Sequence, residues 1–168
     1  GGEFLTGPGD DVTRSEIPGF AIMERPVLLR EYAAWLDDLR VTAPLELEKH
    51  VPWVEVHGPL LHLVDGRHVF APPAPGARKP LAEHPDLPCV GVTRASAEAY
   101  AKWFGAKSCA SLRLPTELQW EKAARGVDGR SYPWGEHFDP TFCSMAVSTQ
   151  GESRLRPAAA FPADVSPY

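Results

Sequence analysis

The chain has 168 residues, of which 43% are hydrophobic, so it is long enough to fold into one globular domain with its own core. Its formal net charge is −5 and its Lys and Arg residues form no cluster, which argues against nucleic-acid binding. The sequence has no window of 18 apolar residues, so we expect no membrane-spanning helix and no membrane partner.

The first elements that the sequence predicts are two strands and a helix. Residues 4–7 read as a strand, a Gly/Pro/Asp turn follows, and residues 17–23 read as a second strand. Residues 27–39 read as a helix because their apolar side chains recur at the helical spacing on one face. That face holds Leu28, Tyr32, Trp35, Leu36 and Leu39.

Residues 41–88 form a long irregular region that is rich in proline and contains one β-hairpin. Two apolar runs flank Asp65 and Gly66, a pair that favours a two-residue hairpin turn. A loop of two residues sets the register of the strands, and this register places His62 and His68 on opposite faces. We therefore expect no metal site from this histidine pair.

A further strand and helix follow the irregular region. Residues 89–92 read as a strand, and Thr93 or Ser96 caps a helix that runs to about residue 104. The predicted buried face of this helix consists of Ala97, Tyr100, Ala101 and Phe104.

Residues 112–126, LRLPTELQWEKAARG, carry the strongest local pattern in the chain. Thr116 is the expected N-cap, and Gln119 completes the S/T-x-x-E/Q capping box. Glu121 and Arg125 form an i, i+4 pair of favourable orientation, and Gly126 is placed to end the helix with a positive φ. The sequence therefore predicts a short, well-capped helix here.

The polar residues of this pattern read as structural. We expect Arg113 to pair with Glu117 or Glu121, and Trp120 and Trp134 to anchor the core. None of them completes a nucleophile–base pair or a metal-ligand set, so no catalytic, cofactor-binding or metal-binding residue is assigned. The residues expected to define the structure are Arg113, Thr116, Glu117, Gln119, Trp120, Glu121 and Trp134.

The string RLPTE-x-x-WEKAARG, followed by DGR-x-YPWGE, closely resembles the signature of the formylglycine-generating-enzyme/sulfatase-modifying-factor family. Residues 1–7, 26–36, 90–103 and 160–168 are similar to other segments of that family. The resemblance implies an α+β, C-type-lectin-like fold with little regular secondary structure. It also implies one domain over residues 1–168, in which residues 41–88 are a family-variable insertion.

The resemblance also implies where this chain ends within the family domain. The run that closes on Tyr168 is similar to the segment that precedes the family's central G-N-V-W-E-W strand. We therefore expect a domain that is truncated or split before that strand. The expected partner is the C-terminal segment, as a separate or cleaved chain, together with a protein or small-molecule ligand of unknown identity.

The three cysteines, Cys89, Cys109 and Cys143, show neither C-x-x-C nor zinc-ligand spacing. They indicate reduced thiols in a cytoplasmic protein, with a single disulfide as the alternative. None matches the family's copper-binding cysteines, so copper would require cysteines in the missing segment.

In calcium-binding members an Asn stands where this chain has Ser144, and Glu152 is the nearby carboxylate. This is a poor calcium set, and we expect no metal in the chain.

The resemblance leaves two function classes open. The leading expectation is a non-catalytic ligand-binding or display module of a larger bacterial protein. Family members fused to serine/threonine kinases have a similar hairpin insertion, and retroelement-diversified variable proteins share the fold. The alternative is part of a copper- and cysteine-dependent formylglycine-generating oxidase, or a relative of the non-haem iron sulfoxide synthases.

Overall fold

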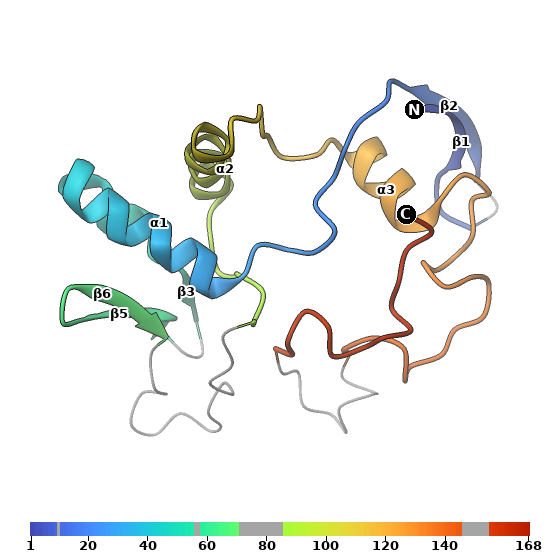
Figure 1. Ribbon diagram of the computed structural model, residues 1–168. Helices are drawn as coiled ribbons and strands as arrows, with labels where there is room; N and C mark the ends of the chain where they lie inside the picture. Colours follow the sequence, from blue (N-terminus) through green and yellow to red (C-terminus); the bar gives the residue numbers. More distant parts are fainter. Residues whose placement is uncertain (10, 56–57, 71–85, 146–154) are drawn as a thin grey trace. The chain divides into compact units, whose positions relative to one another are not determined.

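The computed structural model describes residues 1–9, 11–55, 58–70, 86–145 and 155–168. The chain divides into two compact units, drawn with their elements in Figure 1. Unit 1 comprises Gly1–Glu24, Pro115–Arg154 and Ala159–Tyr168, and unit 2 comprises Arg25–Leu114 and Leu155–Ala158. The single domain predicted over residues 1–168 stays a prediction.

Unit 1 contains a two-stranded antiparallel sheet and one helix. Strand β1 (Gly2–Thr6) pairs with β2 (Thr13–Ile17), with Gly2 opposite Ile17 and Thr6 opposite Thr13. The helix α3 (Glu117–Arg125) packs on β1. The buried apolar residues of unit 1 are Phe4, Ile17 and Ala123.

The structure confirms the first predicted strand and corrects the second. The prediction of a strand over residues 17–23 is wrong, because only Ile17 of that range lies in β2. Pro18 follows Ile17 and has no N–H for a ladder hydrogen bond, and Gly19 adds conformational freedom. The strand therefore ends at Ile17, and its actual residues are the polar Thr13–Ile17 stretch before it.

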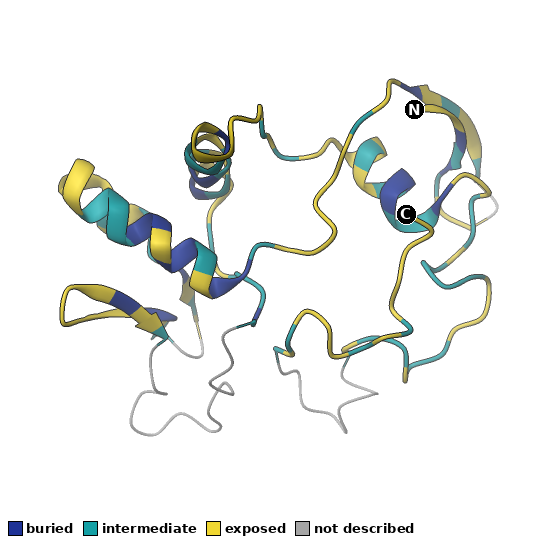
Figure 2. Ribbon diagram, in the orientation of Figure 1, coloured by how far each residue is buried: buried dark blue, intermediate teal, exposed yellow. Residues whose placement is uncertain are grey.

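Unit 2 is built on two helices that pack together around aromatic rings. They are α1 (Leu29–Thr42) and α2 (Arg94–Ser108). Tyr32 of α1 stacks on Tyr100 of α2 with 5.4 Å between ring centroids, and Trp35 meets Tyr32 edge-on at 4.9 Å. The core consists of Leu29, Tyr32, Ala33, Trp35, Leu36, Leu60, Leu61, Leu87 and Tyr100. Figure 2 shows the buried residues gathered along one side of α1.

Short elements complete unit 2 between its helices. A 3₁₀ helix η1 (Pro44–His50) follows α1, and strand β3 (Trp53–Val54) pairs with β4 (Gly58–Pro59). The hairpin of β5 (Leu61–Val64) and β6 (Arg67–Phe70) comes next. Helices beside small antiparallel sheets make the chain α+β, as the sequence predicted.

The structure confirms the predicted hairpin and its register. Asp65 and Gly66 form the turn with φ of 48° and 81°, and Leu63 faces His68 across the strands. His68 is buried. Its backbone N and its ring Nδ1 each lie 2.7 Å from Oδ1 of Asp37 on α1. His62 is exposed on the other face, so the two histidines are not brought together.

The strand predicted over residues 89–92 is wrong, although the helix after it is confirmed. The backbone of this segment makes isolated hydrogen bonds instead of a strand ladder. Cys89 N donates to Val27 O, and Gly91 O accepts from Trp53 N. Gly91 has a φ of +72°, which interrupts an extended strand. Thr93 then caps α2 by accepting a hydrogen bond from Ser96 N, as one of the two predicted caps.

Candidate functional site

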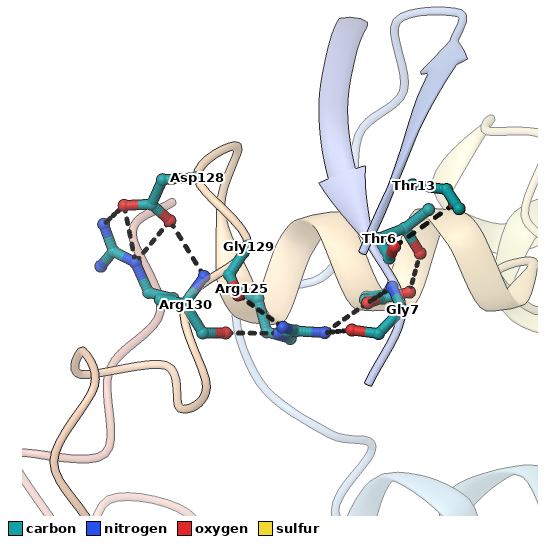
Figure 3. Close-up of polar contacts among 8 residues, drawn as sticks. Thr6, Gly7, Thr13, Arg125, Asp128, Gly129 and Arg130 are labelled. Carbon is teal, nitrogen blue, oxygen red and sulfur yellow. Dashed lines mark hydrogen bonds and ion pairs between the residues drawn. The ribbon is translucent and has the colours of Figure 1, made fainter. Parts of the chain in front are cut away.

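The signature segment forms a polar network that joins α3 to β1 and to the turn after the helix (Figure 3). Glu121 accepts hydrogen bonds from the Thr6 hydroxyl and from Gly7 N, and it pairs with Arg125. Arg125 donates in turn to the carbonyl oxygens of Gly7 at 2.9 Å and Gly129 at 2.6 Å. One ion pair therefore ties three backbone segments together.

The carboxylates of this network are held in their ionised form. Burial raises the pKa of Glu121, but hydrogen bonds from Thr6 and Gly7 and the charge of Arg125 outweigh it and lower the pKa overall. The hydrogen bonds of Arg130 lower the pKa of Asp128 to about 2. Neither group is suited to exchange protons near neutral pH, so the network is a structural clamp.

Several of the structural roles predicted for the signature are present in unit 1. Gln119 N donates to Thr116 Oγ1 at 3.3 Å, and Thr116 N donates to Gln119 Oε1 at 3.0 Å, which is the expected capping box. Glu117 lies in the first turn of α3, and Gly126 ends the helix with a φ of +79°. Arg113 belongs to unit 2, so its predicted pairing with Glu117 or Glu121 stays a prediction.

The two predicted tryptophan anchors differ from the expectation. Trp120 is 62% exposed, so its prediction as a core anchor is wrong. Lys122 and Ala123 occupy the buried side of α3 instead. Trp134 is half-buried; it stacks on Tyr132 with 5.4 Å between ring centroids and donates from Nε1 to His137 O. It supports the loop after α3 rather than the centre of a core.

The cysteines are thiols that differ in environment. Burial raises the pKa of Cys89 to about 12, so this thiol is neutral at physiological pH. Burial and the charges of Asp164 and Asp139 raise the pKa of Cys143, and Cys109 is exposed.

The described ranges contain neither a metal-ligand cluster nor a helix that could cross a membrane. These residues contain no group of three or more His, Cys, Asp or Glu that could hold a metal ion. Ser144 is exposed, and Glu152 of the predicted calcium set lies outside the described residues. None of the described helices combines the length and apolar character that a membrane crossing requires.

The candidate binding site is an open groove of about 750 Å³ in unit 2. Trp53 of β3, which is 56% exposed, is the one large aromatic side chain among the described residues that line it. The other lining residues come from the end of η1 and the residue after it, from β4, from the loop before α2 and from the first turn of α2. They are Glu48, Lys49, Val51, Pro59, Gly91, Val92, Thr93 and Ser96.

Hydrogen bonds attach the groove to the aromatic core beneath it. The buried Ser96 hydroxyl lies 2.9 Å from His50 Nδ1 and 2.8 Å from Thr93 Oγ1. His50 O accepts a hydrogen bond from Tyr32 OH at 2.9 Å, and the His50 ring packs against Trp35. The groove is therefore a preformed surface on a rigid base, the usual arrangement of a ligand site.

Sequence reasoning missed this groove. Its lining comes from two separate stretches of the chain, one that ends at Pro59 and one that begins at Gly91, and β3 and β4 have only two residues each. The one local signal is Trp53 itself, a tryptophan outside any amphipathic pattern. The spacing of the sequence carries no further indication of the site.

Gly91 supplies a test of the groove geometry. A Cβ at Gly91 would lie 2.5 Å from Trp53 O, and its φ is +72°, so we expect Gly91→Ala to lower the free energy of unfolding by about 3 kcal/mol or more. Gly58→Ala is the matched control: its φ is +73° but its Cβ meets no atom of the described residues within 4 Å, so a loss of about 1–2 kcal/mol is expected. Chemical denaturation measures both, and equal losses would contradict the close approach of Gly91 to Trp53.

The comparisons with known proteins agree with the signature. The profile of the Sulfatase-modifying factor enzyme 1-like domain matches residues 1–167. The formylglycine-generating enzyme of Thermomonospora curvata is 42% identical over 78 residues, which cover 46% of this chain and 23% of that protein. The inactive C-alpha-formylglycine-generating enzyme 2 of Bos taurus is 35% identical over 105 residues, which cover 62% and 30%.

A kinase relative covers more of this chain. The serine/threonine-protein kinase Pkn1 of Chlamydia trachomatis is 31% identical over 146 residues, which cover 83% of this chain and 21% of the kinase. The chain thus spans less than a third of the length of each of these relatives. Together with the signature and its capped helix, the match over residues 1–167 shows that the chain belongs to the sulfatase-modifying factor enzyme 1-like domain family.

Proposed function

We propose that this chain is the scaffold part of a non-catalytic, ligand-binding module with a C-type-lectin-like fold, and that the Trp53 groove is its ligand site. The observation that carries the proposal is the exposed indole of Trp53 in an open groove of about 750 Å³. Small-molecule sites have volumes of about 300–1,000 Å³ and combine apolar walls with a few polar groups.

The groove favours a ligand of mixed character. Val51, Val92 and Pro59 supply apolar surface, and Thr93 supplies a hydroxyl. Glu48 and Lys49 add one charge of each sign, and the Lys49 charge is balanced by Glu46 at 2.8 Å. A small organic molecule or a short peptide with a flat apolar face and polar edges is therefore the expected ligand class.

The enzymatic alternative is a copper- and cysteine-dependent oxidase. Copper–thiolate chemistry requires soft thiolate ligands. Burial raises the pKa of Cys89 to about 12, so that thiol is neutral, and the alternative requires copper-binding cysteines other than the three of this chain. The relatives include both formylglycine-generating enzymes and proteins named as inactive, so the names alone favour neither alternative.

The parent protein and the partners are part of the same proposal. The similarity to Pkn1 over 83% of this chain supports a kinase-associated module. A protein or small-molecule ligand of unknown identity is the proposed partner, and the cytoplasm is the proposed location.

Loss of Trp53 tests the proposal. A library of water-soluble aromatic, saccharide and dipeptide fragments is titrated into the protein and followed by saturation-transfer NMR. Fragments that bind are expected to lose about tenfold or more of their affinity to Trp53→Ala, because an exposed aromatic anchor carries much of such a site's binding energy. Trp120→Ala, which removes the exposed tryptophan of unit 1, is the control with unchanged affinity. Equal affinity of the fragments for Trp53→Ala and for the unchanged protein would rule out the groove as their binding site.

A further inference from the structure

The N-terminal end of α2 brings two hydroxyl groups to the wall of the groove, those of Thr93 and Ser96. Thr93 is exposed, whereas Ser96 is only 1% exposed. The Ser96 hydroxyl lies 2.8 Å from Thr93 Oγ1 and 2.9 Å from His50 Nδ1, and it can also donate to Lys49 O at 3.4 Å. The contacts from His50 through Ser96 to Thr93 therefore form a hydroxyl relay that reaches the groove.

The directions of the hydrogen bonds in the relay depend on one another. Each hydroxyl has one proton to donate and two lone pairs that can accept. Thr93 Oγ1 accepts one hydrogen bond from Ser96 N at 3.1 Å. The direction of the bond between the two hydroxyls therefore decides whether Thr93 has a lone pair or a proton left for a ligand.

A neutral His50 ring with its proton on Nε2 has Nδ1 as an acceptor. Ser96 then donates to His50 Nδ1, and Thr93 donates to Ser96 Oγ. Because the proton of Thr93 is used within the relay, Thr93 offers a lone pair to a molecule in the groove. In this state the groove fits a ligand whose edge carries an N–H or O–H donor.

A protonated His50 ring carries a proton on both nitrogens, so Nδ1 becomes a donor to Ser96. Ser96 must then donate elsewhere, and Thr93 Oγ1 at 2.8 Å is a nearer acceptor than Lys49 O at 3.4 Å. Ser96 N and the Ser96 hydroxyl now occupy both lone pairs of Thr93. The proton of Thr93 is therefore free to donate to an acceptor of the ligand, such as a carbonyl oxygen.

We propose that His50 and Ser96 are positioning residues that set the hydrogen-bond polarity of Thr93, and that protonation of His50 changes the preferred ligand of the groove from a donor-edged to an acceptor-edged aromatic molecule. The relay takes up one proton from solvent at His50 and presents one proton to the ligand at Thr93. This inference rests on the proposed function, because it takes the Trp53 groove as the ligand site.

The titratable neighbours of His50 come from η1 and α1, while α2 contributes the two hydroxyls. Glu46 and Lys49 of η1 form an ion pair at 2.8 Å, and Lys49, with a smaller contribution from the charge of His50, lowers the pKa of Glu46. Burial raises the pKa of Tyr32, whose hydroxyl donates to His50 O at 2.9 Å. Glu46 and Tyr32 therefore keep their protonation states between about pH 5 and pH 8, where histidine side chains change charge.

Indole and acetophenone test the change of preference. Indole carries one N–H donor, acetophenone carries one carbonyl acceptor, and neither changes its charge over the range in which histidine titrates. Each probe is titrated into ¹⁵N-labelled protein, and its affinity is read from the shift of the Trp53 indole N–H. We expect the ratio of the indole affinity to the acetophenone affinity to fall about threefold or more between about pH 8 and pH 5. The ¹⁵N shifts of the His50 ring should report the Nε2–H form at the higher pH and the protonated ring at the lower one.

Two variants and one control assign the effect to the relay. Ser96→Ala interrupts the relay and His50→Asn removes the titrating ring, so the affinity ratio of both should stay constant with pH. Glu46→Gln removes a neighbouring charge and keeps the relay, so the change of ratio should persist. Circular dichroism checks that each variant is folded.

Two kinds of result would overturn the inference, and they have different consequences for the groove. A ratio that is constant with pH in the unchanged protein, or that changes equally in Ser96→Ala, would overturn the relay but leave the groove as a ligand site. A Trp53 resonance that neither probe shifts would overturn the proposed function, and the inference with it.

Discussion

Replacing Trp35 by alanine is expected to lower the free energy of unfolding of unit 2 by about 3–5 kcal/mol. Trp35 is 3% exposed, and its ring contacts Tyr32 at 4.9 Å, His50 at 5.0 Å and Tyr100 at 5.8 Å between centroids. The truncation leaves a cavity between α1, α2 and η1 that these rings fill only partly. Native-state hydrogen exchange of the α1 amides measures the loss for unit 2 alone.

Trp53→Ala is the matched control for this prediction. It removes the same side chain from the same unit, but at a position that is 56% exposed. We expect a loss below about 1 kcal/mol, because surface substitutions usually change stability little. A loss below 1 kcal/mol for Trp35→Ala as well would show that the aromatic cluster does not stabilise unit 2.

Replacing Glu121 by glutamine is expected to lower the free energy of unfolding of unit 1 by about 2–4 kcal/mol. The side chains of Glu121 and Arg125 are only 16% and 17% exposed. Glutamine keeps the shape and one acceptor oxygen but removes the charge, so the Arg125 guanidinium loses its carboxylate partner. Hydrogen exchange of the β1 and α3 amides measures the loss.

Glu117→Gln is the control, because it makes the same chemical change one helical turn earlier at an exposed position. Its expected effect is within about 0.5 kcal/mol. Similar losses for the two variants would mean that the clamp between α3 and β1 adds no stability of its own.

The pH dependence of unit 1 gives an independent readout of the same clamp. The pKa of Glu121 is lowered in the folded state relative to the ordinary value of 4.5. Its contribution to stability is therefore complete above about pH 4.5 and is lost as the pH falls through the folded-state value. Glu121→Gln should make the stability of unit 1 less dependent on pH in that acidic range.

Local patterns in the sequence predicted local structure well. The capping box of Thr116 and Gln119 and the turn at Asp65 and Gly66 both depend on residues within four positions of each other. Their hydrogen-bond geometry is set by the chain itself, so no distant contact has to be known.

Features that depend on distant contacts could not be read in this way. Trp120 matches the pattern of a core residue, but the contacts of Lys122 with Gly2 and Phe4, about 120 positions earlier, decide which side of α3 is buried. The groove depends on the contact of Trp53 with Gly91, which precedes α2. Nothing in the local sequence of the two-residue strand β3 indicates this contact. The strand predicted at residues 89–92 failed for the same reason, since Gly91 bends toward Trp53.

Chemical-shift mapping of a bound fragment locates the ligand site of this module. The fragments identified by saturation transfer are titrated into ¹⁵N-labelled protein, and the shifts of the backbone amides and of the Trp53 indole N–H are followed. We expect the largest shifts at Trp53, Gly91, Thr93 and Ser96, which line the groove together. Shifts that gather elsewhere, with these four resonances unchanged, would contradict the assignment of the groove as the binding site.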